Sequence, residues 1–154
     1  LATSFTIRSN GYYLWLGAKR VSTQFDKTDT ALTNITGLSV NVAAGRTYAF
    51  EAVLYTASPN TGGVKFAVAG TATATAIIYE AILDDSAVLT AQTRATALGT
   101  AVVAVTAVTV AYVRITGTIT VNAAGTLTTQ FAQNVASGTS SVLVGSTFIV
   151  NEIL

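Results

Sequence analysis

The clearest alternation of hydrophobic and polar residues runs from residue 108 to residue 135. Up to residue 121, apolar side chains fall on one side of an extended chain, and Tyr, Arg and Thr fall on the other. This predicts a long strand with one buried face, made of Val113, Ile115, Gly117, Ile119 and Val121. Residues 122–125 have the composition of a turn, and the alternation resumes at residue 126. We therefore expect the two halves of this segment to form a β-hairpin.

Shorter segments of the same kind follow one another along the chain. Alternating apolar residues occupy positions 37–42, 46–56, 64–69, 77–83, 102–110 and 142–154, and most of these segments are separated by Gly-containing turns. Residues 88–99 are Ala-rich and fit either a short helix or a strand. About eight to ten closely spaced strands with almost no helical periodicity predict an all-β fold, an antiparallel β-sandwich of jelly-roll type.

The strand expected at 46–56 is largely apolar on both faces, with Phe50 on one side and Val53 on the other. Such a strand lies in the middle of a sandwich or turns its second face toward another subunit. The final strand, at 142–154, has the same property. Glu51 lies on the second face, where a partly buried carboxylate needs a partner. The candidate partners are Arg46, Lys65 and Arg114.

The first twenty residues do not match the remainder of the chain. They contain its densest aromatic run, which includes Tyr12, Tyr13 and Trp15. One interpretation is a strand with both faces buried within the domain. The other is an arm that docks on a neighbouring molecule, because Trp, Tyr and Arg are favoured at the centres of interfaces. We expect residues 1–20 to be an N-terminal arm or attachment segment and residues 21–154 to be the β-sandwich domain.

The composition indicates a surface with few charges. Hydrophobic residues make up 51% of the 154 residues and charged residues only 10%, against about 25% in typical soluble proteins. Such a surface is typical of a protein that buries much of itself against partners, although a monomer with a Thr-rich surface remains an alternative. The net charge of +1 gives no electrostatic reason to expect nucleic acid or anionic lipid as a ligand.

Little in the sequence indicates catalysis. The chain has no His and no Cys, so the usual general base, thiolate nucleophile and zinc ligands are missing, and no phosphate-binding or serine-hydrolase motif is present. A carboxylate pair such as Glu51 with Glu80 or Asp84 is the one arrangement that could serve a glycosidase, but no aromatic groove accompanies it. We expect no enzyme, no cofactor and no metal site. Asp26 and Asp29 are too few ligands for a calcium loop.

Two further features concern the context of the chain. Residues 95–113 are uncharged over the length of a membrane span, but their Thr and β-branched content favours buried strand. Because the chain contains no Met, we expect it to be a processed product or part of a longer translated chain.

Three stretches carry a family resemblance: TALTNITGLSVNVAAGRTYAFEAVLYT, GGVKFAVAG and GTITVNAAGTLTTQFAQNVASGTSSVLVGSTFIVNEIL. Together they resemble the recurrent β-sandwich domain of tailed-bacteriophage structural proteins. That family includes capsid decoration proteins, head fibres and tail-fibre or baseplate modules, and it is similar to the trimeric tumour-necrosis-factor and C1q jelly roll. The resemblance covers roughly residues 21–154 and leaves the N-terminal twenty residues outside.

The resemblance implies a homotrimeric virion protein, a capsid decoration (cement) protein that binds the major capsid protein on the outer capsid surface and stabilises the shell. Under this hypothesis Tyr12, Tyr13 and Trp15 contact the shell, and Tyr112 and Phe148 form the trimer contact. An alternative is the tip domain of a tail fibre, spike or baseplate that binds a host receptor or glycan. A surface-binding protein with Thr rows, such as the alternate Thr residues from 116 to 120, is a third hypothesis.

Overall fold

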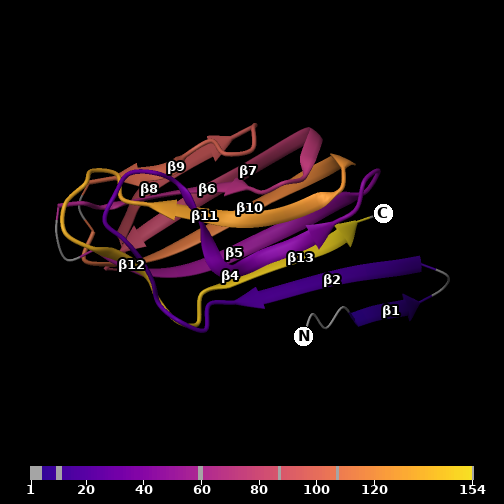
Figure 1. Cartoon of the computed structure of the whole chain (residues 1–154), viewed down its shortest axis with the longest axis horizontal. Coiled ribbons are helices and arrows are strands. Elements are labelled where there is room, and N and C mark those ends of the chain that lie inside the picture. The colour runs from indigo at the N-terminus through magenta and orange to yellow at the C-terminus, as the bar shows by residue number, and fades with distance from the viewer. Residues whose placement is uncertain (1–4, 10–11, 59–60, 87, 107, 154) are drawn as a thin grey trace.

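The computed structural model describes residues 5–9, 12–58, 61–86, 88–106 and 108–153, and for residues 5–9 and 12–16 it describes the backbone alone. Within these ranges the chain forms thirteen strands and no helix (Figure 1). They are β1 (Phe5–Ser9), β2 (Tyr12–Arg20), β3 (Phe25–Lys27), β4 (Thr33–Val42), β5 (Thr47–Ala57), β6 (Val64–Ala69), β7 (Thr73–Asp85), β8 (Val88–Ala95), β9 (Val102–Val105), β10 (Val110–Ala123), β11 (Gly125–Ala132), β12 (Ser140–Val142) and β13 (Thr147–Ile153). The predicted all-β fold is confirmed, and the ambiguous residues 88–99 begin as a strand.

Two antiparallel sheets pack against each other. The large sheet has the order β1-β2-β13-β5-β10-β7-β8, and the short strand β12 pairs with β3 and with the last residues of β5. The small sheet has the order β4-β11-β6-β9. From β4 to β11 the chain changes sheet at every connection except the hairpin between β7 and β8. This alternation between sheets is typical of a jelly roll and confirms the predicted sandwich.

The core lies between the two sheets and receives one face of each of the long strands β4, β5, β7, β10 and β13. In β5 the four side chains predicted on one face are all buried: Tyr48, Phe50, Ala52 and Leu54. The Phe50 ring packs 6.1 Å from Phe148 and 6.4 Å from Tyr79, centroid to centroid. From the small sheet, the Phe66 and Phe131 rings lie 5.2 Å apart. The alternation in the sequence therefore identified the buried face of β5 correctly.

The hairpin predicted for residues 108–135 is wrong. Strand β10 pairs with β5 and β7 in the large sheet, whereas β11 pairs with β4 and β6 in the small sheet. The turn between them therefore carries the chain from one sheet to the other. Gly125, the first residue of β11, lies close to the connection between β6 and β7. A Cβ on Gly125 would be 2.5 Å from the Ala72 nitrogen. The predicted buried face of β10 is nevertheless confirmed, since its Val and Ile members are at most 1% exposed.

The N-terminal strands form one edge of the large sheet (Figure 1). Strand β2 pairs with β1 through residues 12–16 and with β13 from Leu16 to Arg20. The second half of β2 is thus a regular member of the sandwich. The boundary predicted at residue 20 falls at the end of this strand, so residues 17–20 belong structurally with the domain that follows them.

Candidate functional site

The candidate functional site is the surface of the large sheet that faces away from the core. On the four central strands, β13, β5, β10 and β7, successive side chains point alternately into the core and toward this surface. The outward side chains remain partly or fully exposed. We call them the outer face: Ala49, Glu51, Val53, Tyr55, Ile78, Glu80, Ile82, Asp84, Tyr112, Arg114, Thr116, Thr118, Thr147, Ile149 and Asn151.

The outer face exposes large apolar side chains from several strands. Tyr55 of β5 is 44% exposed and Ile78 of β7 is 46% exposed. Val53, Ile82 and Ile149 are half-buried among their neighbours. Isolated exposed hydrophobic residues are ordinary on protein surfaces, but here they share one sheet face. The surface therefore has the character of an interaction site.

Strand register determines which of these side chains are neighbours. At the centre of the face, Ile149 of β13 stands opposite Glu51 of β5, and Glu51 stands opposite Thr116 of β10. Thr116 in turn stands opposite Glu80 of β7, which faces Arg94 of β8. A single row across five strands thus places an aliphatic side chain at one end and two carboxylates along its length.

Both carboxylates in this row are held by arginines. Arg114 donates from Nε and Nη2 to the Glu51 Oε2 atom at 2.8 and 2.6 Å. The hydrogen bonds and the charge of Glu51 raise the pKa of the Arg114 guanidinium above its ordinary value. On the other side of the face, Arg94 Nη2 lies 3.2 Å from Glu80 Oε2. The predicted need of Glu51 for a basic partner is confirmed, and the partner is Arg114.

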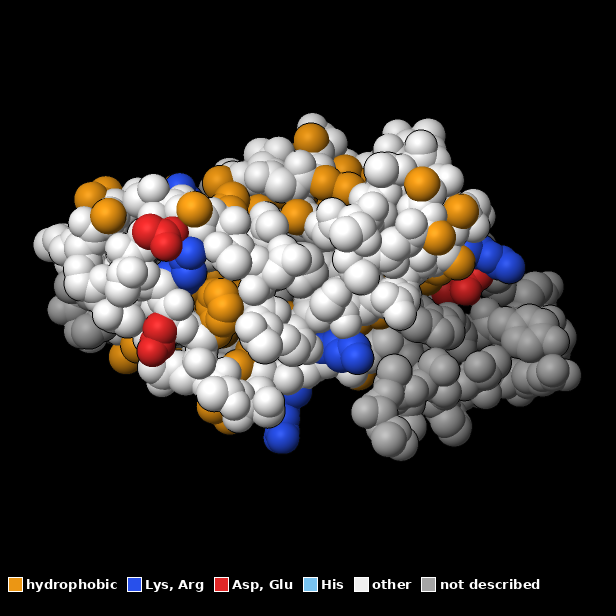
Figure 2. All heavy atoms as spheres, in the orientation of Figure 1, with side chains coloured by type: hydrophobic (Ala, Val, Ile, Leu, Met, Phe, Trp, Pro, Cys, Tyr) orange, Lys and Arg blue, Asp and Glu red, His pale blue; other side chains and the backbone are white. Residues whose placement is uncertain are grey.

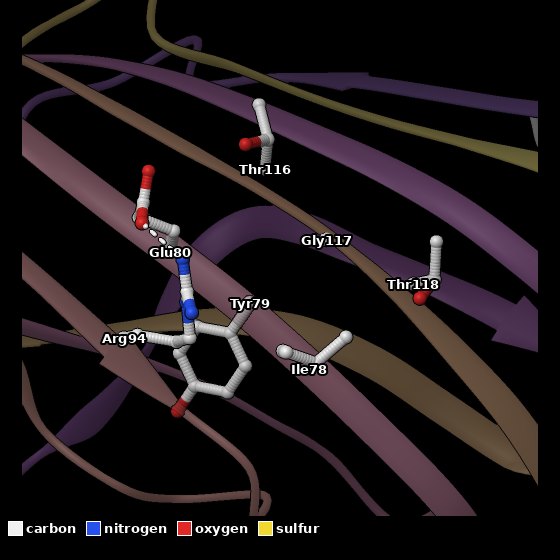
Figure 3. Close-up of a pocket in the computed structure, with 7 residues that line it drawn as sticks. All are labelled: Ile78, Tyr79, Glu80, Arg94, Thr116, Gly117 and Thr118. Carbon is white, nitrogen blue, oxygen red and sulfur yellow. Dashed lines mark hydrogen bonds and ion pairs between the residues drawn. The ribbon is translucent and has the colours of Figure 1, made fainter.

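Two shallow depressions lie on either side of β10 at the middle of the outer face. One, of about 310 Å³, is bordered by Ile78, Glu80, Arg94, Thr116 and Thr118. Figure 3 shows Gly117 between the two threonines, with Glu80 and Arg94 joined nearby. The other depression, of about 410 Å³, is bordered by side chains of β5 and β13. The open shape and the paired charges suit contact with a broad surface better than enclosure of a small molecule.

The outer surface of the small sheet has a different chemistry. On β4 the exposed side chains include Asn34, Ser39 and Asn41, and the buried ones are Ile35, Leu38, Val40 and Val42. On β11, Gln130 donates from Nε2 to the Asn34 Oδ1 atom at 2.8 Å. Polar side chains that bond to one another across neighbouring strands are typical of a sheet face exposed to water. The two faces of the sandwich are therefore unequal, and the apolar residues gather on the large sheet.

The residues predicted to make contacts fall in three different places. Tyr112 is half-buried on the outer face, and its ring lies 5.8 Å from that of Tyr55 in an edge-to-face arrangement. Phe148 is fully buried in the core, so it has no surface to offer to another subunit. Tyr12, Tyr13 and Trp15 lie on β2 by their backbone, but their side chains lie outside the described part of the structure.

The acidic residues considered for calcium are engaged in local bonds. Asp26 accepts hydrogen bonds from the Ser141 hydroxyl at 2.7 Å and from Gln24 at 2.8 Å, and these bonds lower the pKa of its carboxyl. Asp29 binds Lys27 Nζ at 2.9 Å and accepts a bond from the Ala31 amide, which lower its pKa too. Among the described residues, no group of three or more Asp, Glu, His or Cys side chains could hold a metal ion.

The sequence contained a signal for part of the outer face. The two apolar faces of residues 46–56 indicated that Val53 and Tyr55 could face a partner, as the structure now allows. The two apolar faces of residues 142–154 gave the same indication for Ile149. The contribution of Ile78 was missed, because β7 becomes a neighbour of β10 only through a pairing between distant segments.

Comparisons with known proteins give little guidance. No protein family and no curated protein matches the sequence.

Within the described residues no helix is long and apolar enough to cross a membrane.

Solved structures similar to the chain include three of infectious bursal disease virus. They are its VP2 subviral particle (9% identity, TM-score 0.26), the Gx strain (10%, 0.24) and the Gt strain (11%, 0.22). Between 90% and 99% of this chain is covered in these comparisons. The chain spans 45%, 36% and 47% of the length of those proteins.

Proposed function

We propose that the chain is a structural protein of a bacteriophage virion, a capsid decoration (cement) protein that acts as a homotrimer on the outer capsid surface. The observation that supports this proposal is the outer face of the large sheet, a broad surface whose central carboxylates are paired with arginines and which exposes apolar side chains. A surface of this kind binds other proteins rather than small polar molecules. Its partners would be other copies of the chain and the major capsid protein.

The proposed mechanism is passive. A decoration protein adds contact area between neighbouring capsid subunits and binds the assembled shell but not the separated subunits. By mass action, it raises the free energy needed to open the shell. This role requires a rigid domain with surfaces that bind neighbours, and it requires no catalytic residue. The two-sheet sandwich with its buried aromatic core provides such a domain.

The experiment that tests this function adds the purified chain to empty capsid shells of the phage that encodes it. We expect saturable co-sedimentation with the shells, and shells that withstand higher temperature or more denaturant than undecorated ones. The same amount of chain mixed with unassembled capsid protein is the control, because a cement protein binds the assembled state. If the chain does not bind shells but binds a host-surface glycan on an array, the proposal is contradicted. That result would favour the alternative function, the receptor-binding tip domain of a fibre or spike.

A further inference from the structure

We infer that copies of this chain bind one another through the outer face of the large sheet. This inference rests on the proposed function and deepens it, because it names the contact surface of the oligomer. The two sheets offer two candidate surfaces. They differ in chemistry, and that difference identifies the large sheet as the surface that associates.

The first argument is the distribution of apolar surface. The outer face carries Val53 and Tyr55 on β5, Ile149 on the adjoining β13, and Ile78 on β7, which β10 separates from β5. Charged side chains make up only 10% of the chain, and Figure 2 shows them widely spaced on the side of the molecule in view, so a scarcity of charge does not by itself distinguish the two faces. The exposed side of β4 in the small sheet carries Ser and Asn at the equivalent alternating positions. Removing apolar area from water is the main driving force of association, so the outer face gains more from being covered.

The second argument is electrostatic. The carboxylates at the centre of the face, Glu51 and Glu80, are each neutralised within the same copy, by Arg114 and Arg94. Asp84, nearer one end of the face, has no ion pair among the described residues, but the centre of the face, where both carboxylates are paired, attracts a charged partner only weakly. An identical surface can approach it without like-charge repulsion. The partner whose chemistry fits this face is therefore a second copy of this chain.

The third argument is size and relief. Four strands about 4.8 Å apart and about ten residues long, at about 3.4 Å per residue, cover roughly 600 Å². Standard specific interfaces bury about 800 Å² per partner, so the face is close to the size needed. At its middle, small residues such as Ala49 and Thr116 border the depressions beside Gly117. Aliphatic side chains of the face that border neither depression, such as Val53 and Ile82, have the size to enter the depressions of another copy.

The test is the molar mass of matched variants in solution by light scattering. Wild type is expected at a multiple of 15.8 kDa. Val53→Asp places a charge at the centre of the outer face, and we expect it to be a monomer. Ser39→Asp places the same charge on the exposed side of β4, and we expect it to keep the wild-type mass. A monomeric wild type, or a Val53→Asp variant that keeps the oligomeric mass, would overturn the inference.

A second measurement does not depend on a disruptive substitution. Because the chain has no Cys, one introduced thiol is the only site for a maleimide. We expect Thr116→Cys to react at least roughly tenfold more slowly than Ser39→Cys, since the core of an interface excludes water and reagent. Circular dichroism shows that each variant is folded. Equal labelling rates in an oligomeric sample would refute the inference even if Val53→Asp failed to fold.

The outcomes separate this inference from the proposed function. If the chain binds shells as a monomer, the inference about the contact surface is refuted and the proposed role on the shell stands. If the chain oligomerises through the outer face but does not bind shells, the contact surface stands and the proposed role is refuted.

Discussion

Gly117 shows how a single position shapes both sides of the large sheet. A Cβ at this residue would lie 2.4 Å from the Ile78 carbonyl oxygen, 2.6 Å from the Tyr79 Cβ and 2.7 Å from the Phe50 ring. These atoms belong to the backbone or to packed core side chains, so they cannot move aside cheaply. Glycine is required here by close packing between β10 and its neighbours, and its backbone also borders the depressions on the outer face.

We predict that Gly117→Ala lowers the free energy of unfolding by about 2–3 kcal/mol, because overpacking a tight core displaces its neighbours. The measurement is urea denaturation at one fixed protein concentration, since association shifts apparent stability. The matched control is Thr118→Ala on the exposed side of the same strand, with an expected loss below about 1 kcal/mol. Equal stability of wild type and Gly117→Ala would mean that β10 does not pack closely against Phe50 and Tyr79.

At the same scale, the sequence predicts which residues share a face but not always which face is inside. The buried side of β10 was clear because its opposite side is rich in Thr and Arg. Residues 147–153 are apolar on both sides, and Phe148 was wrongly expected at a subunit contact. The structure buries Phe148 against Phe50 and leaves Ile149 on the outer face. Alternation alone cannot resolve that choice, because it contains no information on which strands lie above.

Elements were predicted better than their partners. The alternation located the long strands, but the expected hairpin between β10 and β11 is a connection between two sheets. A short Gly-containing turn suits either arrangement, and the choice depends on pairings with β4, β5, β6 and β7. Those partners lie far away in the sequence, so local turn chemistry does not reveal them. The large sheet's outer face was therefore only partly predictable.

The loop between β11 and β12 is held by one buried side chain, that of Gln133. Its Nε2 donates to the Ser137 and Gly138 carbonyl oxygens at 2.9 and 3.2 Å and to the Ser140 hydroxyl at 3.1 Å. Its Oε1 accepts the Ser137 amide at 3.1 Å. Gln133 thus provides the hydrogen bonds that ladder pairing would provide within a strand.

We predict that Gln133→Ala destabilises the fold by about 2–4 kcal/mol, because it leaves buried loop groups without partners and opens a cavity. Hydrogen exchange should accelerate at the Ser137 amide, which shows that the loop itself has loosened. The control is Gln130→Ala on the exposed side of β11, where only a surface hydrogen bond is lost and the cost should stay within about 1 kcal/mol. Unchanged protection at Ser137 would contradict this role of Gln133.

On the scale of the whole molecule, the N-terminal and C-terminal strands close the sandwich together. Strand β13 lies between β2 and β5 and pairs with both. It also supplies Phe148 and Val150 to the core, where both side chains are completely buried. The edge strand β1, in contrast, pairs with β2 as its one described neighbour. The two ends of the chain therefore differ in their importance for the fold.

We predict that removing residues 147–154 abolishes cooperative thermal unfolding. Strand β2 would lose its pairing with the rest of the sheet, and the core would lose the buried side chains of Phe148 and Val150. Removing residues 1–9 instead takes away β1 at the edge of the large sheet, and we expect that shortened chain to keep a single cooperative transition. Scanning calorimetry distinguishes the two outcomes. A cooperative transition at the wild-type temperature after removal of β13 would show that the large sheet does not need this strand.

The position of β13 also determines how the molecule responds to a mechanical load. Strand β13 is antiparallel to both of its neighbours, and its last residue, Ile153, pairs with Thr47 at the end of the ladder with β5. Tension applied to the chain at Ile153, directed away from β5, breaks one backbone pair after another from this end, so the strand peels away at low force. Pressure spread over the outer face is instead shared by four strands at once. This domain therefore resists a load spread over its outer face better than a load applied at the end of β13.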